Sequence, residues 1–278
     1  MVNSAVRRVY RWKPIQWILT TAGLDFYIRK TYKRFQEIQA GTTNFESGDI
    51  SVELSETTVP DEEMYLEPEE MVLDDLLREL GPDDIFWDIG ADEGLYTCLA
   101  SEKITNGSVV AFEPHPVRRN RLERNLERNR LTAILRTEAL TNTNGTAEFG
   151  YAIQTDNKDG EFTATLRMGD DLVSEEKVCH PSVLKIDVEG AEYEVIQGMK
   201  STLSSSECRL VYCELHDIEG RGFEGSKQKV KDTLEELGFE ISTLTTRVGD
   251  GWEQPYLKAE KVSLYYILLP RSNLRQQV

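Results

Sequence analysis

The sequence predicts an α/β protein with a mostly parallel sheet and helices on both faces, and three observations lead to that prediction. Short apolar runs that suit strands buried on both faces alternate with segments whose apolar residues recur at helical spacing. The run Ile85–Ile89 ends in an acidic, glycine-bearing turn, and a helical pattern begins just beyond it. A second buried run, residues 107–113, ends in the carboxylate Glu113. A strand, a glycine turn, a helix and an acid-ended strand together indicate a nucleoside site.

The composition indicates a globular protein with an acidic surface. The 278 residues include 49 acids and 32 bases, which give a net charge of -17. Such a surface binds nucleic acid poorly, so we expect no nucleic-acid partner. The acidity also suggests a halophile protein, because concentrated salt screens self-repulsion; an ordinary acidic cytosolic enzyme is the alternative.

A basic segment precedes the acidic body. Residues 1–36 contain eight bases and one acid, a net charge of +7, together with apolar and aromatic residues at helical spacing. Its apolar stretch is too short and too polar to span a bilayer. We expect residues 1–40 to form a basic amphipathic arm, which either associates peripherally with a membrane through residues 1–36 or packs on the domain. The expected location is cytoplasmic, with the inner face of the membrane as the site of any attachment.

The arm is followed by a linker and then by the main domain. Residues 41–66 are predicted to be a linker with one short strand near Ile50–Leu54, and residues 67–278 to form the catalytic domain. An amphipathic helix is expected to begin at Pro68 and to end before Gly81. Its predicted inward residues are Met71, Leu73, Leu76, Leu77 and Leu80.

The spacing of the glycine turn separates two cofactor chemistries. The pattern is Asp88-x-Gly90-x-x-x-Gly94, with further acids at Asp92 and Glu93. A dinucleotide site needs G-x-G-x-x-G, because a pyrophosphate must approach the helix N-terminus. Three carboxylates would repel a pyrophosphate but would tolerate a cationic sulfonium. The turn therefore favours S-adenosylmethionine over NAD, and Glu113 is the expected acceptor of both ribose hydroxyls.

The chain beyond Glu113 is predicted to continue the sheet. An arginine-rich helix with a solvated, ion-paired face leads to a third strand, Leu131–Arg136, and an adenine ring could lie beyond it at residues 137–140. Residues 141–170, which include Asn144-Gly145, suggest an inserted β-hairpin near the substrate mouth. Strands near Phe239–Leu244 and Val262–Leu269 are expected to close the sheet as an antiparallel pair.

A second group of polar residues follows the strand at Val183–Ile186. Lys185, Asp187, Glu189 and Glu192 gather near its carboxyl end, where open α/β sheets bind ligands. The next strand, residues 209–215, brings Glu214 and His216 to the same edge. No metal site is predicted, because the four cysteines show no C-x-x-C pair and the three histidines show no H-x-x-x-H pair.

The order of four motifs resembles the FkbM family of S-adenosylmethionine-dependent methyltransferases. These motifs are residues 88–97, 111–116, 185–192 and 214–216, and Asp92 stands where the family usually has Asn. The resemblance implies a Rossmann-like class I methyltransferase with strand order 3-2-1-4-5-7-6 and the last strand antiparallel. It also implies O-methylation, often of sugars or polyketide-like alcohols. The cofactor-binding candidates are Asp88, Gly90, Asp92, Gly94, Thr97, Glu113, Pro114 and Ala139.

The candidate catalytic residues are Asp187, Glu189, His216 and Lys185. For a hydroxyl acceptor on a glycan or small molecule, one of the first three must take a proton, and His216 has the best unperturbed pKa. For a carboxylate acceptor no base is needed, and Lys185 could hold the substrate. The alternative for these residues is a structural ion-pair cluster. The alternatives for the whole protein are an NAD-dependent oxidoreductase and a non-catalytic membrane-associated module with the same fold.

Overall fold

The computed structural model describes residues 42–47, 50–55, 63–149, 162–216, 226–249 and 252–262. The predicted arm, residues 1–40, lies outside them. Strands β1 (Thr42–Ser47) and β2 (Ile50–Ser55) form a two-stranded sheet, and β2 confirms the predicted short strand. Among the helices in these ranges, none has the length and apolar character needed to cross a bilayer.

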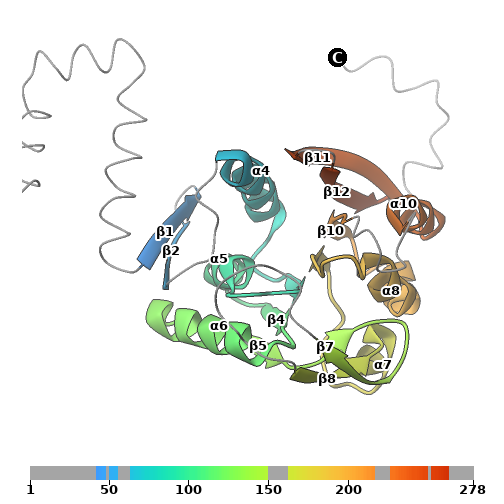
Figure 1. Cartoon of the computed structure of the whole chain (residues 1–278), viewed down its shortest axis with the longest axis horizontal. Coiled ribbons are helices and arrows are strands. Elements are labelled where there is room, and N and C mark those ends of the chain that lie inside the picture. The colour runs from blue at the N-terminus through green and yellow to red at the C-terminus, as the bar shows by residue number, and fades with distance from the viewer. Residues whose placement is uncertain are drawn as a thin grey trace, which may run out of the picture. The chain divides into compact units, whose positions relative to one another are not determined.

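A seven-stranded sheet organises the larger part of the chain, in the order β11-β12-β10-β9-β3-β4-β5 (Figure 1). Neighbouring strands from β10 to β5 run parallel, whereas β12 is antiparallel to both β10 and β11. This is the strand order that the family resemblance implies, so the predicted fold class is confirmed. The strands are β3 (Ile85–Ile89), β4 (Ser108–Phe112), β5 (Ile134–Arg136), β9 (Val183–Ile186), β10 (Leu210–Glu214), β11 (Phe239–Gly249) and β12 (Trp252–Lys261).

Helices cover both faces of this sheet. The helices are α4 (Glu63–Glu79), α5 (Leu95–Lys103), α6 (Pro116–Asn129), α7 (Gly169–Ser174), α8 (Glu192–Gln197), α9 (Lys200–Ser204) and α10 (Ser226–Glu236). On one face, Trp87 and Ile89 share a hydrophobic core with residues of α7, α8, α9 and α10. On the other face, Tyr212 of β10 donates a hydrogen bond to Asp75 of α4, at 2.6 Å.

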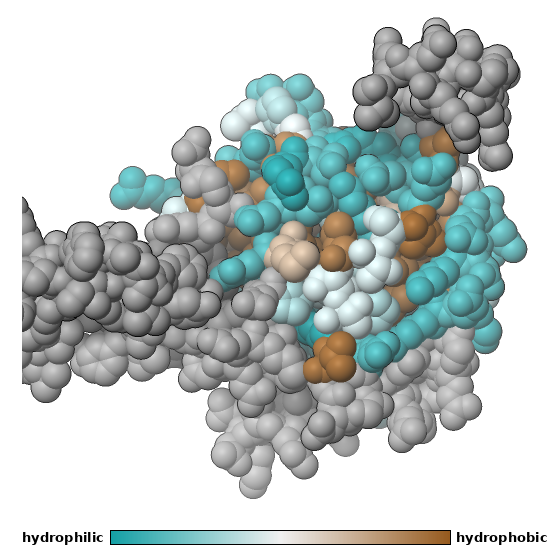
Figure 2. Space-filling model, turned by 90° about the horizontal axis from the view of Figure 1, so that it is seen from above, coloured by the Kyte–Doolittle hydropathy of each residue, from teal (hydrophilic) through white to brown (hydrophobic). Residues whose placement is uncertain are grey.

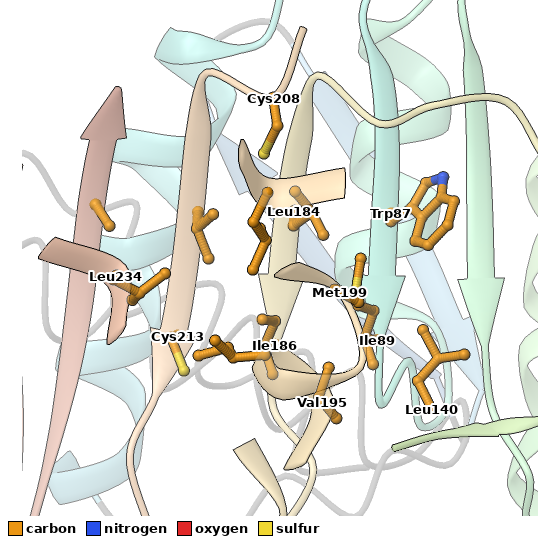
Figure 3. Close-up of a cluster of buried hydrophobic side chains, with 14 of the residues drawn as sticks. Trp87, Ile89, Leu140, Leu184, Ile186, Val195, Met199, Cys208, Cys213 and Leu234 are labelled. Atoms are coloured by element: carbon orange, nitrogen blue, oxygen red, sulfur yellow. The ribbon is translucent and has the colours of Figure 1, made fainter. Parts of the chain in front are cut away.

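The main core explains why the central strands read as continuous apolar runs. Figure 3 shows Leu184 and Ile186 of β9 beside Trp87 and Ile89 of β3, with Val195 of α8 in the same cluster. All five side chains are buried. Strands that are buried on both faces do not alternate between apolar and polar residues, so each appears in the sequence as a short, mainly apolar run. Asp88 in β3 and Lys185 in β9 are the polar exceptions.

Hydrophilic residues cover most of the described surface seen in Figure 2, with hydrophobic residues showing between them.

Helix α4 differs from its prediction in one inward residue and in its start. Met71 is 54% exposed, which makes its predicted inward position wrong, and the neighbouring Val72 is fully buried instead. The helix around them also begins earlier than predicted. It begins at Glu63 and contains Pro68 as its sixth residue, beyond the first turn, where proline is best tolerated.

The last strand of the sheet lies earlier in the chain than predicted. The partner of β11 is β12, Trp252–Lys261, and the predicted strand Val262–Leu269 lies outside the described residues after its first residue. Residues 250–251 are Asp-Gly, a sequence typical of tight hairpins, so β12 directly follows β11. Tyr256, Leu257 and Ala259 of β12 are fully buried and give the strand its place in the core.

A smaller sheet contains the predicted insertion, in the order β6-β8-β7. Its strands are β6 (Ala139–Leu140), β7 (Gly145–Phe149) and β8 (Phe162–Arg167). Strands β7 and β8 are antiparallel, as predicted for a hairpin. Asn144-Gly145 is not the turn, however, because Gly145 begins β7, and the connection lies in residues 150–161, which are outside the described residues.

Candidate active site

The glycine turn after β3 brings two strand ends into direct contact. Gly90 has a φ of 81°, and a Cβ atom there would lie 1.8 Å from the backbone oxygen of Asp187. Its N–H donates to the carbonyl of Phe112 at 3.0 Å, while the N–H of Asp187 donates to Ile89. Only glycine can supply both this left-handed conformation and this close approach.

Asp88 and Thr97 lie under the glycine turn and are fully buried. The Thr97 hydroxyl donates to Asp88 Oδ2 at 2.6 Å, and Lys185 Nζ lies 3.7 Å from Asp88 Oδ1. Burial raises the pKa of Asp88, although Lys185 opposes that change. Asp88 therefore links the turn to β9 through Lys185 and does not itself face solvent.

Glu113, at the end of β4, is held by two backbone donors. The N–H of Asp92 donates to Oε2 at 2.9 Å, and the N–H of His115 donates to Oε1 at 2.7 Å. Asp92 adopts a left-handed φ of 48° and forms an ion pair with Arg118 at 3.2 Å. Each Glu113 oxygen has a second lone pair, so the carboxylate can still accept two hydroxyl donors.

Affinity for a ribose-bearing ligand is expected to depend on the protonation of Glu113. Burial raises the pKa of Glu113 to about 7, and the charge of Asp92 adds to the effect. The ionised carboxylate accepts both hydroxyls, whereas the protonated form loses charge-assisted acceptance. We therefore expect S-adenosylmethionine to bind more weakly as the pH falls from about 8 to about 6, a trend that calorimetry can measure. Glu113→Gln should remove the dependence, and a dependence that persists in this variant would assign it to another group.

The remaining cofactor-binding candidates lie around the same turn. Gly94, with a φ of 92°, precedes α5, and a Cβ atom there would meet Leu122 of α6 at 2.8 Å. Pro114 lies between β4 and α6, and its carbonyl accepts a hydrogen bond from Arg119. Ala139 lies in β6 of the smaller sheet, within residues 137–140, where an adenine ring is expected to lie.

The second group of polar residues begins at the end of β9. Lys185 is buried, and its Nζ donates to Asp187 Oδ2 at 3.1 Å and lies over the Tyr96 ring. Burial would raise the pKa of Asp187, but Lys185 and His216 lower it below its usual value. Glu189 follows with a left-handed φ of 55° and a half-exposed side chain. The loop after β9 thus presents two carboxylates at the sheet edge.

His216, just beyond β10, faces these carboxylates. Its Nδ1 lies 2.8 Å from Glu192 Oε1, and its Nε2 lies 3.9 Å from Asp187 Oδ1, 3.8 Å from Glu189 Oε2 and 3.9 Å from Glu214 Oε1. Burial alone would lower the pKa of His216, but Glu192 and the nearby acids raise it to about 9. The imidazole is therefore protonated near neutral pH, which weakens the argument from its unperturbed pKa that it acts as the base.

Sequence reasoning missed the partners of Glu214. Arg247 of β11 donates to Glu214 Oε1 at 2.6 Å and also pairs with Glu69 of α4. Burial and the charge of Asp187 raise the pKa of Glu214 to about 8. Glu69 and Arg247 are 178 residues apart in the chain, and neither lies in a motif, so no local pattern could have indicated them.

The polar residues around the Gly90 turn and those at the ends of β9 and β10 together form one continuous polar edge of the sheet. Asp88, Lys185, Asp187 and His216 are connected by successive contacts of 3.1 to 3.9 Å. The predicted catalytic residues all lie in this edge, beside the Gly90 turn; they are Lys185, Asp187, Glu189 and His216. The arrangement can hold a nucleoside at Glu113 and can bring a second ligand to the acids at the ends of β9 and β10.

Comparison with known proteins identifies a family. The family model of the methyltransferase FkbM domain matches residues 88–241, more than half of the chain.

Two relatives match parts of the chain. The hexuronic acid methyltransferase AglP of Haloferax volcanii is 35% identical over 157 residues, which cover 54% of this chain and 64% of AglP. The AMB antimetabolite synthetase AmbE of Pseudomonas aeruginosa is 27% identical over 208 residues, which cover 59% of this chain and 10% of AmbE. The chain therefore spans less than two thirds of the length of either relative.

Among solved structures, methyltransferase FkbM from Methylobacillus flagellatus KT is 14% identical, with a TM-score of 0.47. The alignment covers 65% of this chain and 44% of that chain.

Proposed function

The chain belongs to the FkbM methyltransferase family, and we propose from this premise that it transfers a methyl group from S-adenosylmethionine to an oxygen atom of a sugar. The observation that carries the proposal is the paired Gly90 turn and Glu113 carboxylate. Glu113 accepts two backbone hydrogen bonds and retains one lone pair on each oxygen. A ribose with two hydroxyl donors requires two such acceptor positions side by side.

The charges around the turn support a sulfonium cofactor. The carboxylates Asp88, Asp92 and Glu113 surround it. Lys185 lies 3.7 Å from Asp88 and Arg118 pairs with Asp92, whereas Glu113 forms no ion pair within the described part of the chain. A cation carrying an amino-acid tail is attracted by this field, whereas a pyrophosphate is repelled. NAD-dependent oxidation is therefore the weaker candidate.

The proposed reaction is an in-line displacement at the cofactor's methyl carbon. The carbon–sulfur bond breaks as the oxygen–carbon bond forms, and the sulfonium becomes a neutral thioether. Positioning and exclusion of water supply most of the effect, because positive charge disappears during the reaction. A hydroxyl acceptor loses its proton to a base at the sheet edge, where Asp187, Glu189 and His216 are the candidates. A carboxylate acceptor needs no base.

We propose that the acceptor is a sugar acid, either free or within a glycan. The support is the 35% identity to AglP, whose name gives hexuronic acid as its substrate. A hexuronic acid offers both a carboxylate and hydroxyls as methyl acceptors.

The test is transfer of labelled methyl from S-adenosylmethionine to oligosaccharides that contain hexuronic acid. We expect label in the sugar fraction with the natural protein and none with Glu113→Ala, and less label when neutral hexose oligosaccharides replace the acidic ones. Treatment with mild base identifies the product, because an ester releases its methyl group and an ether keeps it. Absence of label in every sugar fraction would contradict the proposed function.

A separate proposal concerns the basic arm, residues 1–40. Each basic residue near an anionic membrane contributes up to about 1 kcal/mol, and residues 1–36 carry a net charge of +7. We expect the full chain to co-sediment with anionic liposomes, less strongly at high salt. A protein beginning at Gly41, which lacks the arm but keeps β1, should remain in solution with unchanged cofactor affinity. Aggregation of the shortened protein, or loss of cofactor binding, would make the arm part of the fold.

A further inference from the structure

The sheet edge beside the Gly90 turn carries a cluster that the sequence did not indicate as a metal site. One ligand atom each from Asp187, Glu214 and His216 lies within 4.8 Å of the other two. We propose that these three residues bind one divalent transition-metal ion, which displaces the Nε2 proton of His216 to solvent, and that this ion holds the methyl acceptor. The metal site is independent of the proposed function, whereas its role toward the acceptor rests on that function.

The first argument is the environment of the His216 imidazole. The side chain is 5% exposed, and Nδ1 is bonded to Glu192 at 2.8 Å. Within the part of the chain that the structure describes, Nε2 has no partner at hydrogen-bond distance, and its neighbours are carboxylate oxygens at 3.8 to 3.9 Å. An imidazolium paired directly with a carboxylate would lie at about 2.7–2.9 Å. Ligands that share one ion through bonds of about 2.0–2.2 Å lie about 3–4 Å apart, which suits these separations better.

The second argument is that each proposed ligand is oriented by a partner of its own. Lys185 donates to Oδ2 of Asp187 and leaves Oδ1 toward His216. Arg247 donates to Glu214 at 2.6 Å. Metal-binding histidines usually donate their second N–H to a carboxylate, and carboxylate ligands are themselves hydrogen-bonded. The cluster has this arrangement at His216 and Asp187, whereas at Glu214 the arginine holds Oε1, the oxygen that lies 3.9 Å from His216 Nε2.

The contact with Glu192 also determines which imidazole nitrogen of His216 is available to a metal ion. Glu192 is 1% exposed, and its Oε1 also accepts the N–H of Gly190 at 2.9 Å. Because Oε1 of Glu192 is held by the Gly190 N–H, it stays in place to keep Nδ1 of His216 occupied, and Nε2 faces Asp187 and Glu214. One imidazole nitrogen with two carboxylates suits Mn²⁺, Co²⁺ or Zn²⁺ better than Mg²⁺, which prefers oxygen ligands.

Three protein ligands leave coordination positions for a substrate, as in catalytic metal sites. A sugar acid approaching Asp187, Glu189 and Glu214 would otherwise meet like charges at close range. An ion at this edge would bind the sugar carboxylate and a neighbouring hydroxyl. If the hydroxyl is the acceptor, its oxygen takes the methyl group as the carbon–sulfur bond breaks, and its proton passes to the half-exposed Glu189. No electron transfer is involved.

The test is titration of Mn²⁺ into chelator-treated full-length protein, followed by calorimetry and electron paramagnetic resonance. We expect one Mn²⁺ per chain. His216→Ala and Glu214→Gln should abolish this binding, and Glu192→Gln should weaken it by about 10- to 100-fold through loss of histidine orientation. Glu123→Gln, which removes an exposed acid from α6, is the matched control and should bind as the natural protein does. No Mn²⁺ binding by the natural protein, or equal binding by all four variants, would overturn the site.

Activity then separates the metal proposal from the proposed function. We expect chelator to stop methyl transfer while S-adenosylmethionine still binds, and added Mn²⁺ to restore it. Bound Mn²⁺ without methyl transfer to any sugar acid would keep the site and remove the proposed function. Methyl transfer at an unchanged rate in chelator, without Mn²⁺ binding, would remove the metal and keep the function.

Discussion

Gly90→Ala is expected to destabilise the protein by at least about 2 kcal/mol and to abolish binding of S-adenosylmethionine. The new methyl group would lie 1.8 Å from the backbone oxygen of Asp187, and backbone cannot move aside as a flexible side chain can. The left-handed φ of 81° adds strain of its own. Chemical unfolding and calorimetry with the cofactor measure the two effects.

Gly145→Ala is the matched control for this experiment. A Cβ atom at Gly145 would have nothing within 4 Å, and its φ lies outside the left-handed range. We expect this variant to keep the stability and cofactor affinity of the natural protein. Equal loss in the two variants, or no loss in Gly90→Ala, would contradict the close approach of the β3 and β9 ends.

Asp187→Asn is expected to lower the methyl-transfer rate by about 10²-fold or more. Asp187 lies at the end of β9, with Oδ1 facing His216, so it can serve at this edge either as a base or as a ligand of the proposed ion. Asparagine keeps an oxygen that can accept the Lys185 hydrogen bond, so the loss of stability should be small compared with the loss of rate. Steady-state turnover and the thermal midpoint of unfolding separate the two.

Asp92→Asn makes the same chemical change in the cofactor turn. Asp92 is half-exposed and paired with Arg118, so its substitution should leave turnover within a few-fold of the natural rate. If both variants lose rate equally, or if Asp187→Asn loses stability in proportion to rate, then Asp187 has a structural role only.

The central sheet could be predicted because its strands carry their environment in their composition. β3, β4, β9 and β10 are buried on both faces, and each is a short apolar run that ends near an acid or glycine. The last strand of the sheet, β12, is harder to predict. The run after Val262 is more apolar than β12, which alternates in part and was therefore overlooked.

The candidate site could be predicted only where its residues are close in sequence. Lys185, Asp187 and Glu189 lie in one motif, whereas the contact of Arg247 with Glu214 depends on how β11 pairs across the sheet. Metal-site patterns in sequence rely on short spacing between ligands, and Asp187 and His216 are far apart in the chain. The pKa of His216 likewise depends on acids from both strand ends, which an unperturbed value leaves out.

The most direct test of the account is calorimetric titration of S-adenosylmethionine into the natural protein and into Glu113→Ala. The account predicts one site per chain, with binding weakened in the variant by about 1.5–3 kcal/mol through loss of a charge-assisted contact to two hydroxyls. Equal affinity in the two proteins would contradict a ribose held by Glu113, and no binding to the natural protein would contradict the cofactor itself.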